Sequence, residues 1–287
     1  MHTPTTDIAP PLLATPPGDS VRVIAVASGK GGVGKTNITA NLAVTLAQRG
    51  ERVWVLDADL GLANLDVVYG VTPERTLLHV LRGEHRLADV VALGPAGVRL
   101  IPAASGVAEL TALTPAQQLA VLEEVETLEG TLDLLLIDVA AGISSNVLFF
   151  AAAATETLVV VTPEPTAITD AYALIKVLAT RWGRTEVPVV VNMATSARDA
   201  EEAFGRLARV AAQFLPVRLE YVGWVPFDDA VPRAVRSQAP VAIAAPGTPA
   251  ARAIAALGDR LIGRDAATTT GGGLQFFFRR LLAEGRA

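Results

Sequence analysis

The sequence predicts an α/β fold with a doubly wound, mostly parallel sheet and helices on both faces. Short apolar runs rich in β-branched residues alternate with longer runs of helical periodicity between residues 21 and 261. This alternation is typical of parallel sheets whose strands are buried on both faces. In addition, acidic side chains end two of the apolar runs, at Asp57 and Asp138, and the carboxyl ends of parallel strands form the ligand-binding edge of such sheets.

A glycine-rich loop separates the first predicted strand, residues 21–27, from the first predicted helix, residues 37–48. Its G-x-x-x-x-G-K-[ST] spacing is that of a phosphate-binding loop, with Lys35 between the outer phosphates and the Thr36 hydroxyl placed to ligate Mg²⁺. Glycines let the loop N–H groups face one concavity at the positive end of the helix dipole. The alternative is a glycine turn followed by Lys-Thr by chance. The predicted nucleotide-binding residues of the loop are Gly29, Lys30, Gly31, Gly32, Val33, Gly34, Lys35, Thr36 and Asn37.

The second lysine of this loop, Lys30, is the more informative one. Lysine occurs elsewhere only at Lys176, so two lysines in one loop of an arginine-rich chain indicate a need for compact ammonium groups. The loop resembles the deviant Walker A motif of the MinD/ParA family of ATPases. This resemblance implies ATP and Mg²⁺ as ligands and a homodimer formed with ATP, in which Lys30 contacts the phosphates held by the other subunit. A solvated loop lysine is the alternative.

The next strand is predicted over residues 52–56 and ends in Asp57-Ala58-Asp59. The resemblance assigns Asp57 to the water shell of Mg²⁺ and gives Asp59 the catalytic role of orienting or deprotonating the attacking water. Asn64 belongs to the first switch and helps to hold that water. The alternative for both aspartates is capping of the following helix.

Scaffold elements separate this motif from the third acidic position. We expect one or two short helices over residues 76–91, a strand over 98–102 and a helix over 115–128. The strand predicted over residues 132–138 ends in Asp138, which matches the Walker B pattern and contacts Mg²⁺ through water. Gly142 follows in the second switch, where its amide can flip to sense the γ-phosphate. Relatives commonly carry Ser or Thr at the position of Val139, so a hydroxyl is missing here.

The second half of the chain continues the alternation. Strands are predicted over residues 157–162, 187–192 and 219–225, and helices over 163–182, 198–214, 230–236 and 249–261. Asn192 resembles the family residue that hydrogen-bonds adenine, since an amide offers both a donor and an acceptor; a turn asparagine is the alternative. Pro226 and Asp228 are expected to flank the base.

Several stretches resemble the flagellar number regulators FlhG and FleN: Asn37 after the loop, residues 162–172, residues 191–193 and residues 273–282. The resemblance covers residues 21–283. It implies a switch that limits flagellar number or placement together with an FlhF-type GTPase, a flagellar transcription activator or switch-complex proteins. Residues 7–13 lack the Gln and Arg of a GTPase-activating motif found in many relatives, so that activity is not expected. The alternatives are a MinD-type division-site organiser and a ParA-type DNA segregation ATPase.

Composition limits the remaining possibilities. The absence of cysteine from the 287 residues fits a reducing cytosol and excludes cysteine-ligated iron–sulfur members of the superfamily. A net charge of −5 gives no general reason to bind nucleic acid. With 51% hydrophobic residues the chain can bury one substantial core, and no apolar block is long enough to cross a bilayer.

Four segments are expected. Residues 1–20 form a disordered, proline-rich lead without a signal peptide, residues 21–262 the ATPase domain, and residues 263–273 a flexible linker. Residues 274–283 form an amphipathic helix that binds the inner membrane surface in the ATP dimer, so the protein is cytoplasmic and peripheral on the cytoplasmic face of the membrane when ATP-bound. The apolar face of this helix comprises Leu274, Phe277, Phe278, Leu281 and Leu282.

Overall fold

A computed structural model describes residues 21–107 and 112–263. Its sheet has eight strands in the order β3-β4-β2-β5-β1-β6-β7-β8. All neighbouring strands are parallel except β3 and β4, which are antiparallel, so the predicted doubly wound, mostly parallel sheet is confirmed. The strands are β1 (Arg22–Ser28), β2 (Val53–Ala58), β3 (Ala92–Leu93), β4 (Arg99–Ile101), β5 (Leu134–Ala141), β6 (Glu156–Val161), β7 (Glu186–Ala194) and β8 (Arg218–Pro226).

Strand β1 lies near the centre of the sheet, between β5 and β6. From β1 the chain first crosses to β2 on one side, and after β5 it places β6 on the other side. Strand order therefore reverses at β1, and the loops that leave the carboxyl ends of the central strands diverge there. In open parallel sheets this divergence opens the crevice that binds ligands. The glycine-rich loop follows β1 directly.

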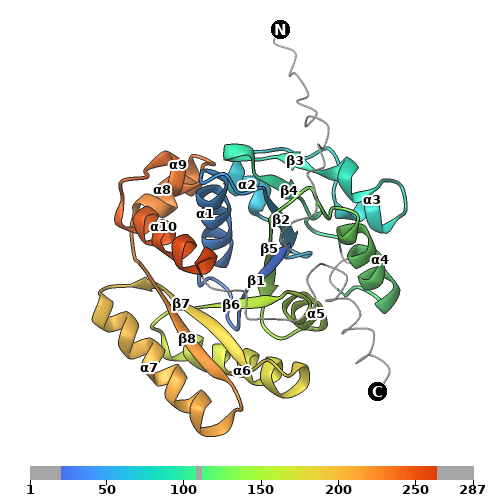
Figure 1. Cartoon of the computed structure of the whole chain (residues 1–287). Helices are drawn as coiled ribbons and strands as arrows, with labels where there is room; N and C mark the ends of the chain where they lie inside the picture. Colours follow the sequence, from blue (N-terminus) through green and yellow to red (C-terminus); the bar gives the residue numbers. More distant parts are fainter. Residues whose placement is uncertain (1–20, 108–111, 264–287) are drawn as a thin grey trace.

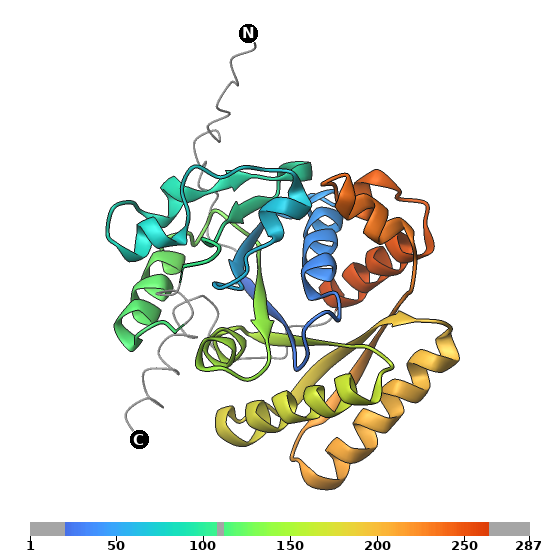
Figure 2. The ribbon, with the colours of Figure 1, turned by 180° about the vertical axis from the view of Figure 1, so that it is seen from behind.

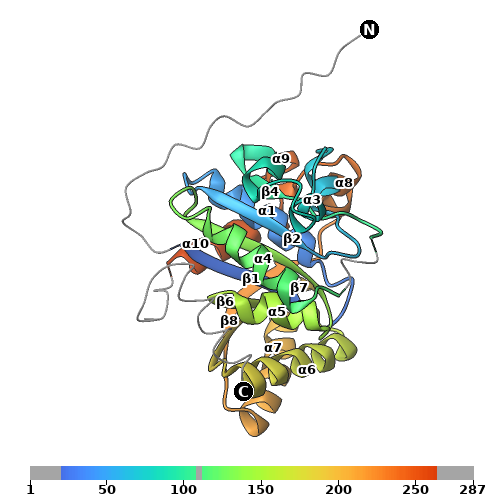
Figure 3. The ribbon, with the colours of Figure 1, turned by 90° about the vertical axis from the view of Figure 1, so that its right-hand side faces the viewer.

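Helices cover both faces (Figure 1). On one face α1 packs on β1, β2 and β5 and contacts α2, α9 and α10; on the other, α5, α6 and α7 pack on the strands from β5 to β8. Figure 3 shows α6 and α7 at the end of the molecule opposite α8 and α9. The helices are α1 (Lys35–Ala47), α2 (Leu65–Tyr69), α3 (Leu77–Leu81), α4 (Pro115–Glu126), α5 (Ser145–Ala153), α6 (Pro165–Trp182), α7 (Ala197–Phe214), α8 (Ala230–Arg236), α9 (Val241–Ala244) and α10 (Pro249–Ile262).

Helix α1 is buried almost all round, from Ile38 to Leu46. A surface helix usually keeps one polar face toward water, but α2, α9 and α10 cover that side of α1 (Figure 2). Gly258 of α10 permits this approach, because a Cβ there would lie 3.1 Å from both Leu46 Cδ2 and Arg49 Nη1. The helix that begins at the glycine-rich loop is thus held rigidly from all sides.

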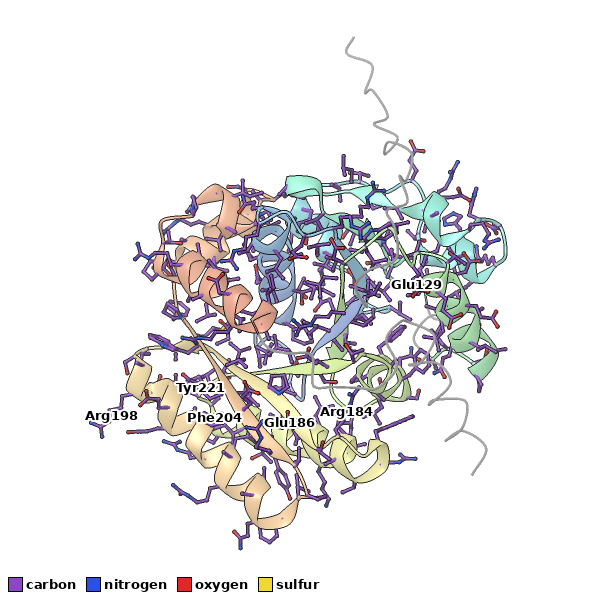
Figure 4. The ribbon with its side chains drawn as sticks, in the orientation of Figure 1. Glu129, Arg184, Glu186, Arg198, Phe204 and Tyr221 are labelled. Atoms are coloured by element: carbon purple, nitrogen blue, oxygen red, sulfur yellow. The ribbon has the colours of Figure 1, made fainter. Side chains whose placement is uncertain are left out.

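At the far edge of the sheet, α7 packs on β8 through the rings of Phe204 and Tyr221, whose centroids are 4.9 Å apart (Figure 4). Glu186 and Arg218 form an exposed ion pair between β7 and β8 at 2.6 Å. Glu186 begins β7, at the end of the sheet opposite the site. These contacts join α7, β7 and β8, so this edge of the sheet has a structural role.

Most predicted elements are present, with some differences in detail. The predicted helices between residues 76 and 91 are α3 and a 3₁₀ turn (Leu87–Val90). Elements α2, α9 and β3 were not predicted, because elements of five, four and two residues are too short to show a periodicity. Within the described residues no helix is both long and apolar enough to span a bilayer. The predictions for residues 1–20, for most of the linker and for the helix at 274–283 fall outside the described residues.

Candidate functional site

The glycine-rich loop runs from the end of β1 to Lys35, the first residue of α1. Gly34 is the N-cap of α1, with φ of 87°. A Cβ at Gly34 would lie only 2.3 Å from Asn192 Nδ2, so both its conformation and its neighbour demand glycine. Among the described residues, no side chain caps this helix start. Its N–H groups and the helix dipole are therefore available to an anion.

Lys35 and Thr36 lie against Asp138, a buried carboxylate near the carboxyl end of β5. Lys35 is only 8% exposed, and its charge, together with a side-chain hydrogen bond from Thr36, acts on the Asp138 carboxylate. The predicted phosphate-binding lysine, metal-binding hydroxyl and Walker B carboxylate are thus neighbours. The sequence predicts these three residues at one site, and their roles toward phosphate and Mg²⁺ stay predictions.

Asp57 and Asp138 face each other across β2 and β5, where they are partners in the register of the sheet. Each is 1% exposed. The Asp57 carboxylate accepts backbone N–H groups from Asp59, at Oδ1, and from Asn64 and Leu65, at Oδ2, all at 3.1 Å. A carboxylate offers about four acceptor positions, so one remains, on Oδ1. Asp57 therefore holds the loop that carries Asp59.

Burial dominates the electrostatics of this carboxylate pair. It raises the pKa of Asp57 to about 8, and the Asp138 carboxylate adds to the increase, although the backbone N–H groups oppose it. Burial also raises the pKa of Asp138 against the lowering effects of Lys35, Thr36 and Thr39. The net increase persists although Lys35 lies beside Asp138, so a further cation would favour the ionised form of both carboxylates.

The donor set fits Mg²⁺. No cluster of three or more His, Cys, Asp or Glu side chains forms a metal cage in residues 21–107 and 112–263, and Mg²⁺ in nucleotide sites uses one or two carboxylates, phosphates and waters instead. The hard oxygens of Thr36, Asp57 and Asp138 supply that set beside the phosphate loop. A second, independent reason to place Mg²⁺ here is that a cation would balance the charge of the two carboxylates.

The proposed catalytic residue Asp59 and the two proposed switch residues, Asn64 and Gly142, occupy loops beside this pair. Asp59 is half-buried just beyond β2. Asn64 is exposed, and its Nδ2 donates to the Leu62 carbonyl at 2.6 Å. Gly142, with φ of 96°, donates its N–H to the Ser28 carbonyl at 2.9 Å. The Gly142 amide thus has a definite partner at the start of the phosphate loop, from which it would have to turn to contact a phosphate.

Lys30 contacts the start of α6 and not the carboxylate pair. Its Nζ donates to Glu164 Oε2 at 2.6 Å and to Thr166 Oγ1 at 2.9 Å. The side chains of Lys30 and Glu164 are 37% and 63% exposed. Sequence analysis missed both partners of Lys30, because they lie more than 130 residues away and only the pairing of β1 with β6 brings them together.

The residues predicted to contact adenine lie at the ends of β7 and β8. Asn192 is 6% exposed, and its Nδ2 donates to the Val33 carbonyl at 2.8 Å, so it also supports the phosphate loop. Pro226 ends β8 near Asn192, whose own register partner is Val225. The two oxygens of Asp228 accept the N–H groups of residues 230 and 250. Asp228 therefore joins the starts of α8 and α10, while base contact by Asn192, Pro226 and Asp228 stays a prediction.

One further hydroxyl at the site was not predicted. Thr39 of α1 is fully buried, and its Oγ1 lies 3.2 Å from Asp138 Oδ1. The available signal was its position one helical turn after Lys35, on the face that also carries Thr36. Without the fold, nothing in the sequence distinguishes it from a threonine that bonds its own helix.

Together, the phosphate loop, the buried carboxylate pair and the hydroxyls beside it define a Mg²⁺-dependent P-loop ATPase with a deviant Walker A motif. The sequence matches the family described as "ParA: NUBPL iron-transfer P-loop NTPase" over residues 20–262. The chain belongs to this ParA family of P-loop NTPases. Because the 287 residues contain no cysteine, thiolate ligation of an iron–sulfur cluster, which other members use, is not available to them.

Relatives and solved structures agree with this assignment. The "Antiactivator FleN" of Pseudomonas aeruginosa is 47% identical over 262 residues, which cover 91% of this chain and 94% of that protein. The "Flagellum site-determining protein YlxH" of Helicobacter pylori is 35% identical and covers 92% of this chain and 90% of its own length. The cell division ATPase MinD of Pyrococcus furiosus superposes with a TM-score of 0.72 at 29% identity, over 84% of this chain and 98% of that one. MinD of Pyrococcus horikoshii, solved with Mg-ADP, gives 0.71 at 27% identity, over 85% and 98%.

Proposed function

We propose that this protein is an ATP-dependent dimerising switch that regulates the number or placement of flagella and binds the inner membrane reversibly in its ATP-bound dimer. The flagellar assignment rests on the similarity to FleN and YlxH along nearly the whole of each chain. The expected partners are an FlhF-type GTPase, a flagellar transcription activator or switch-complex proteins. Direct contact with nucleic acid is not expected, given the net charge of −5.

The observation that carries the dimer proposal is the position of Lys30. Its ammonium lies at the mouth of the phosphate loop, and its partners within the described part of the chain are two exposed side chains, Glu164 and Thr166. It is thus free to exchange them for the phosphates held by another subunit. Leu62 and Ile143, which are 71% and 50% exposed, follow β2 and β5 at the same edge of the sheet. A facing subunit would remove this apolar surface from water.

Within each subunit we assign the reaction as follows. Lys35 and the loop N–H groups bind the phosphates, and Thr36, Asp57 and Asp138 hold Mg²⁺, the two carboxylates through water. Bound Mg²⁺ neutralises charge on the phosphate oxygens. Asp59, held by its N–H contact with Asp57, orients the attacking water. Gly142 turns its amide from Ser28 toward the γ-phosphate, and this change reports the presence of ATP.

The membrane proposal concerns residues 274–283. Its five large apolar side chains recur at i, i+3, i+4, i+7 and i+8, and Arg279 and Arg280 favour anionic lipid. One short helix binds weakly, whereas a dimer presents two copies and gains avidity. We would pellet anionic liposomes with wild type, Phe277→Asp and a chain ending at Gly273, each with ADP and with ATP. Binding that ignores both the nucleotide and the loss of the helix would contradict the proposal.

Flagellar counts in a deletion strain test the function itself. We expect altered number or placement by electron microscopy, restored by wild type and not by Lys35→Ala. Normal flagella in the deletion strain would overturn the proposal.

A second candidate, a MinD-type division-site organiser, is favoured by the fold similarity to MinD at a TM-score of 0.72. The same deletion strain separates the two functions. A division-site organiser predicts minicells with normal flagella, while the flagellar switch predicts normal division.

A further inference from the structure

Thr39 lies on α1, one helical turn after the phosphate loop, and is fully buried. Its single hydroxyl proton has two acceptor oxygens within hydrogen-bond distance, the Lys35 carbonyl at 3.0 Å and Asp138 Oδ1 at 3.2 Å, so it is donated to one of them at a time or shared between both. The first contact is the usual one for a threonine within a helix, which bonds the carbonyl four residues earlier. The second contact joins α1 to β5, across 99 residues of sequence. The bond to the Lys35 carbonyl would be enough to satisfy a buried threonine hydroxyl, so burial alone does not explain the contact with Asp138.

The second contact reaches the carboxylate that the site uses. Asp138 is 1% exposed, and hydroxyl groups of Thr36 and Thr39 both bond its side chain. Thr36 and Thr39 are three residues apart on one face of α1. Thr36 lies at the mouth of the loop, where the nucleotide site begins, and Thr39 lies one turn deeper in the core. The two hydroxyls therefore approach Asp138 from the site and from the interior respectively.

The interior contact limits how the carboxylate can turn. The terminal torsion of an aspartate has a broad energy minimum, so the orientation of its oxygens depends on their hydrogen-bond partners. Among the described residues, Thr36 and Thr39 are the hydroxyl partners of Asp138. If Thr36 gives its oxygen to Mg²⁺, Thr39 is the hydroxyl that keeps one carboxylate oxygen in place.

We propose that Thr39 is a positioning residue of the ATPase site: its buried hydroxyl orients the Asp138 carboxylate so that the other carboxylate oxygen faces the water shell of Mg²⁺. Because Thr39 is fully buried one helical turn beyond the loop, its proposed action on the metal site goes through Asp138. Outer partners of metal-binding groups typically change metal affinity or activity about 10- to 100-fold when removed. The expected loss is of that size.

Thr39→Val tests the proposal, because valine keeps the shape and removes the hydroxyl, and Thr39→Ser keeps the hydroxyl and removes the methyl group. The matched control is Thr45→Val, the same change at a buried threonine of the same helix. Two properties are measured for each full-length variant. The first is ATP hydrolysis as a function of ATP and Mg²⁺ concentration, and the second is binding of a fluorescent ADP with Mg²⁺ and with EDTA.

For Thr39→Val we expect kcat to fall about 10- to 100-fold, with a higher Mg²⁺ requirement and a smaller Mg²⁺ effect on ADP affinity. Binding in EDTA stays at the wild-type value, because the phosphate loop is intact. Thr39→Ser and Thr45→Val behave like wild type. Thr39→Ala provides the same comparison if the valine variant does not fold, as judged by circular dichroism.

Three results would overturn the proposal. Wild-type Mg²⁺ dependence in Thr39→Val would show that the hydroxyl does not act on the metal site. An equal loss in Thr39→Ser would assign the effect to the methyl group and to packing. Weaker ADP binding in EDTA would mean that the substitution disturbs the phosphate loop itself. None of these results depends on the flagellar role, which is tested in cells.

Discussion

The contact between Lys30 and Glu164 predicts that the free protomer restrains its own dimerisation. For a subunit to use Lys30 on a facing nucleotide, its ammonium must leave Glu164 Oε2, at 2.6 Å, and Thr166 Oγ1, at 2.9 Å. Replacing Glu164 with Gln keeps the length of the side chain and removes the charge that holds Lys30. The variant should therefore dimerise more readily with ATP than wild type.

The exposure of the pair sets the magnitude. Because the side chains are 37% and 63% exposed, the ion pair is worth about 0.2–1 kcal/mol. A symmetric dimer breaks one such pair in each subunit, so the total is about 0.4–2 kcal/mol. This corresponds to a decrease of about 2- to 30-fold in the dimer dissociation constant. Because the pair is exposed, salt screens it and should shrink the difference between variant and wild type.

Sedimentation velocity with a non-hydrolysable ATP analogue measures the dissociation constant. Glu186→Gln is the matched control, since Glu186 (Figure 4), 41% exposed, belongs to another exposed ion pair and lies at the start of β7, away from the phosphate loop. In a Lys30→Ala background, which should not dimerise, Glu164→Gln should not restore the dimer, because the carboxylate acts only through Lys30. Weaker dimerisation of Glu164→Gln, or a dimer restored by Glu164→Gln in the Lys30→Ala background, would refute the reasoning.

The other predictions concern the same site. Lys35→Ala should abolish nucleotide binding, whereas Lys30→Ala should bind ATP as a monomer and fail to dimerise; isothermal titration that gives equal losses of affinity would contradict this separation. Asp59→Ala should bind Mg-ATP, hydrolyse it orders of magnitude more slowly and accumulate as a dimer; light scattering that finds it monomeric at saturating ATP would remove the assignment. In EDTA the folded protein keeps a proton on Asp57 up to about pH 8, while the unfolded chain loses it near its usual pKa of 3.8. The free energy of unfolding should then fall with rising pH between these values, by up to about 1.4 kcal/mol per unit. Urea titrations should show this slope, Asp57→Asn and added Mg²⁺ should flatten it, and a flat wild-type profile in EDTA would contradict it.

The fold class and the centre of the site could be predicted from the sequence because both depend on local patterns. The strand before the glycines and the helix after them have opposite periodicities, and the loop spacing requires the turn between them. Asp57 and Asp138 each end an apolar strand, and parallel strands carry their carboxyl ends to one edge. Their convergence therefore follows from the strand prediction, without any knowledge of strand order.

Pairwise contacts between distant segments were decided only by the tertiary structure. The strand order places β6 beside β1 and so brings Glu164 to Lys30, and it places β5 under α1 and so brings Asp138 to Thr39. Asn192 shows the same limit: its residue type predicts an adenine contact, but its bond to Val33 depends on how β7 approaches the loop. Local sequence specifies which groups each segment offers, because periodicity and turn chemistry act over a few residues. Which of those groups meet is set by strand order and helix packing, which depend on the free energy of the whole core.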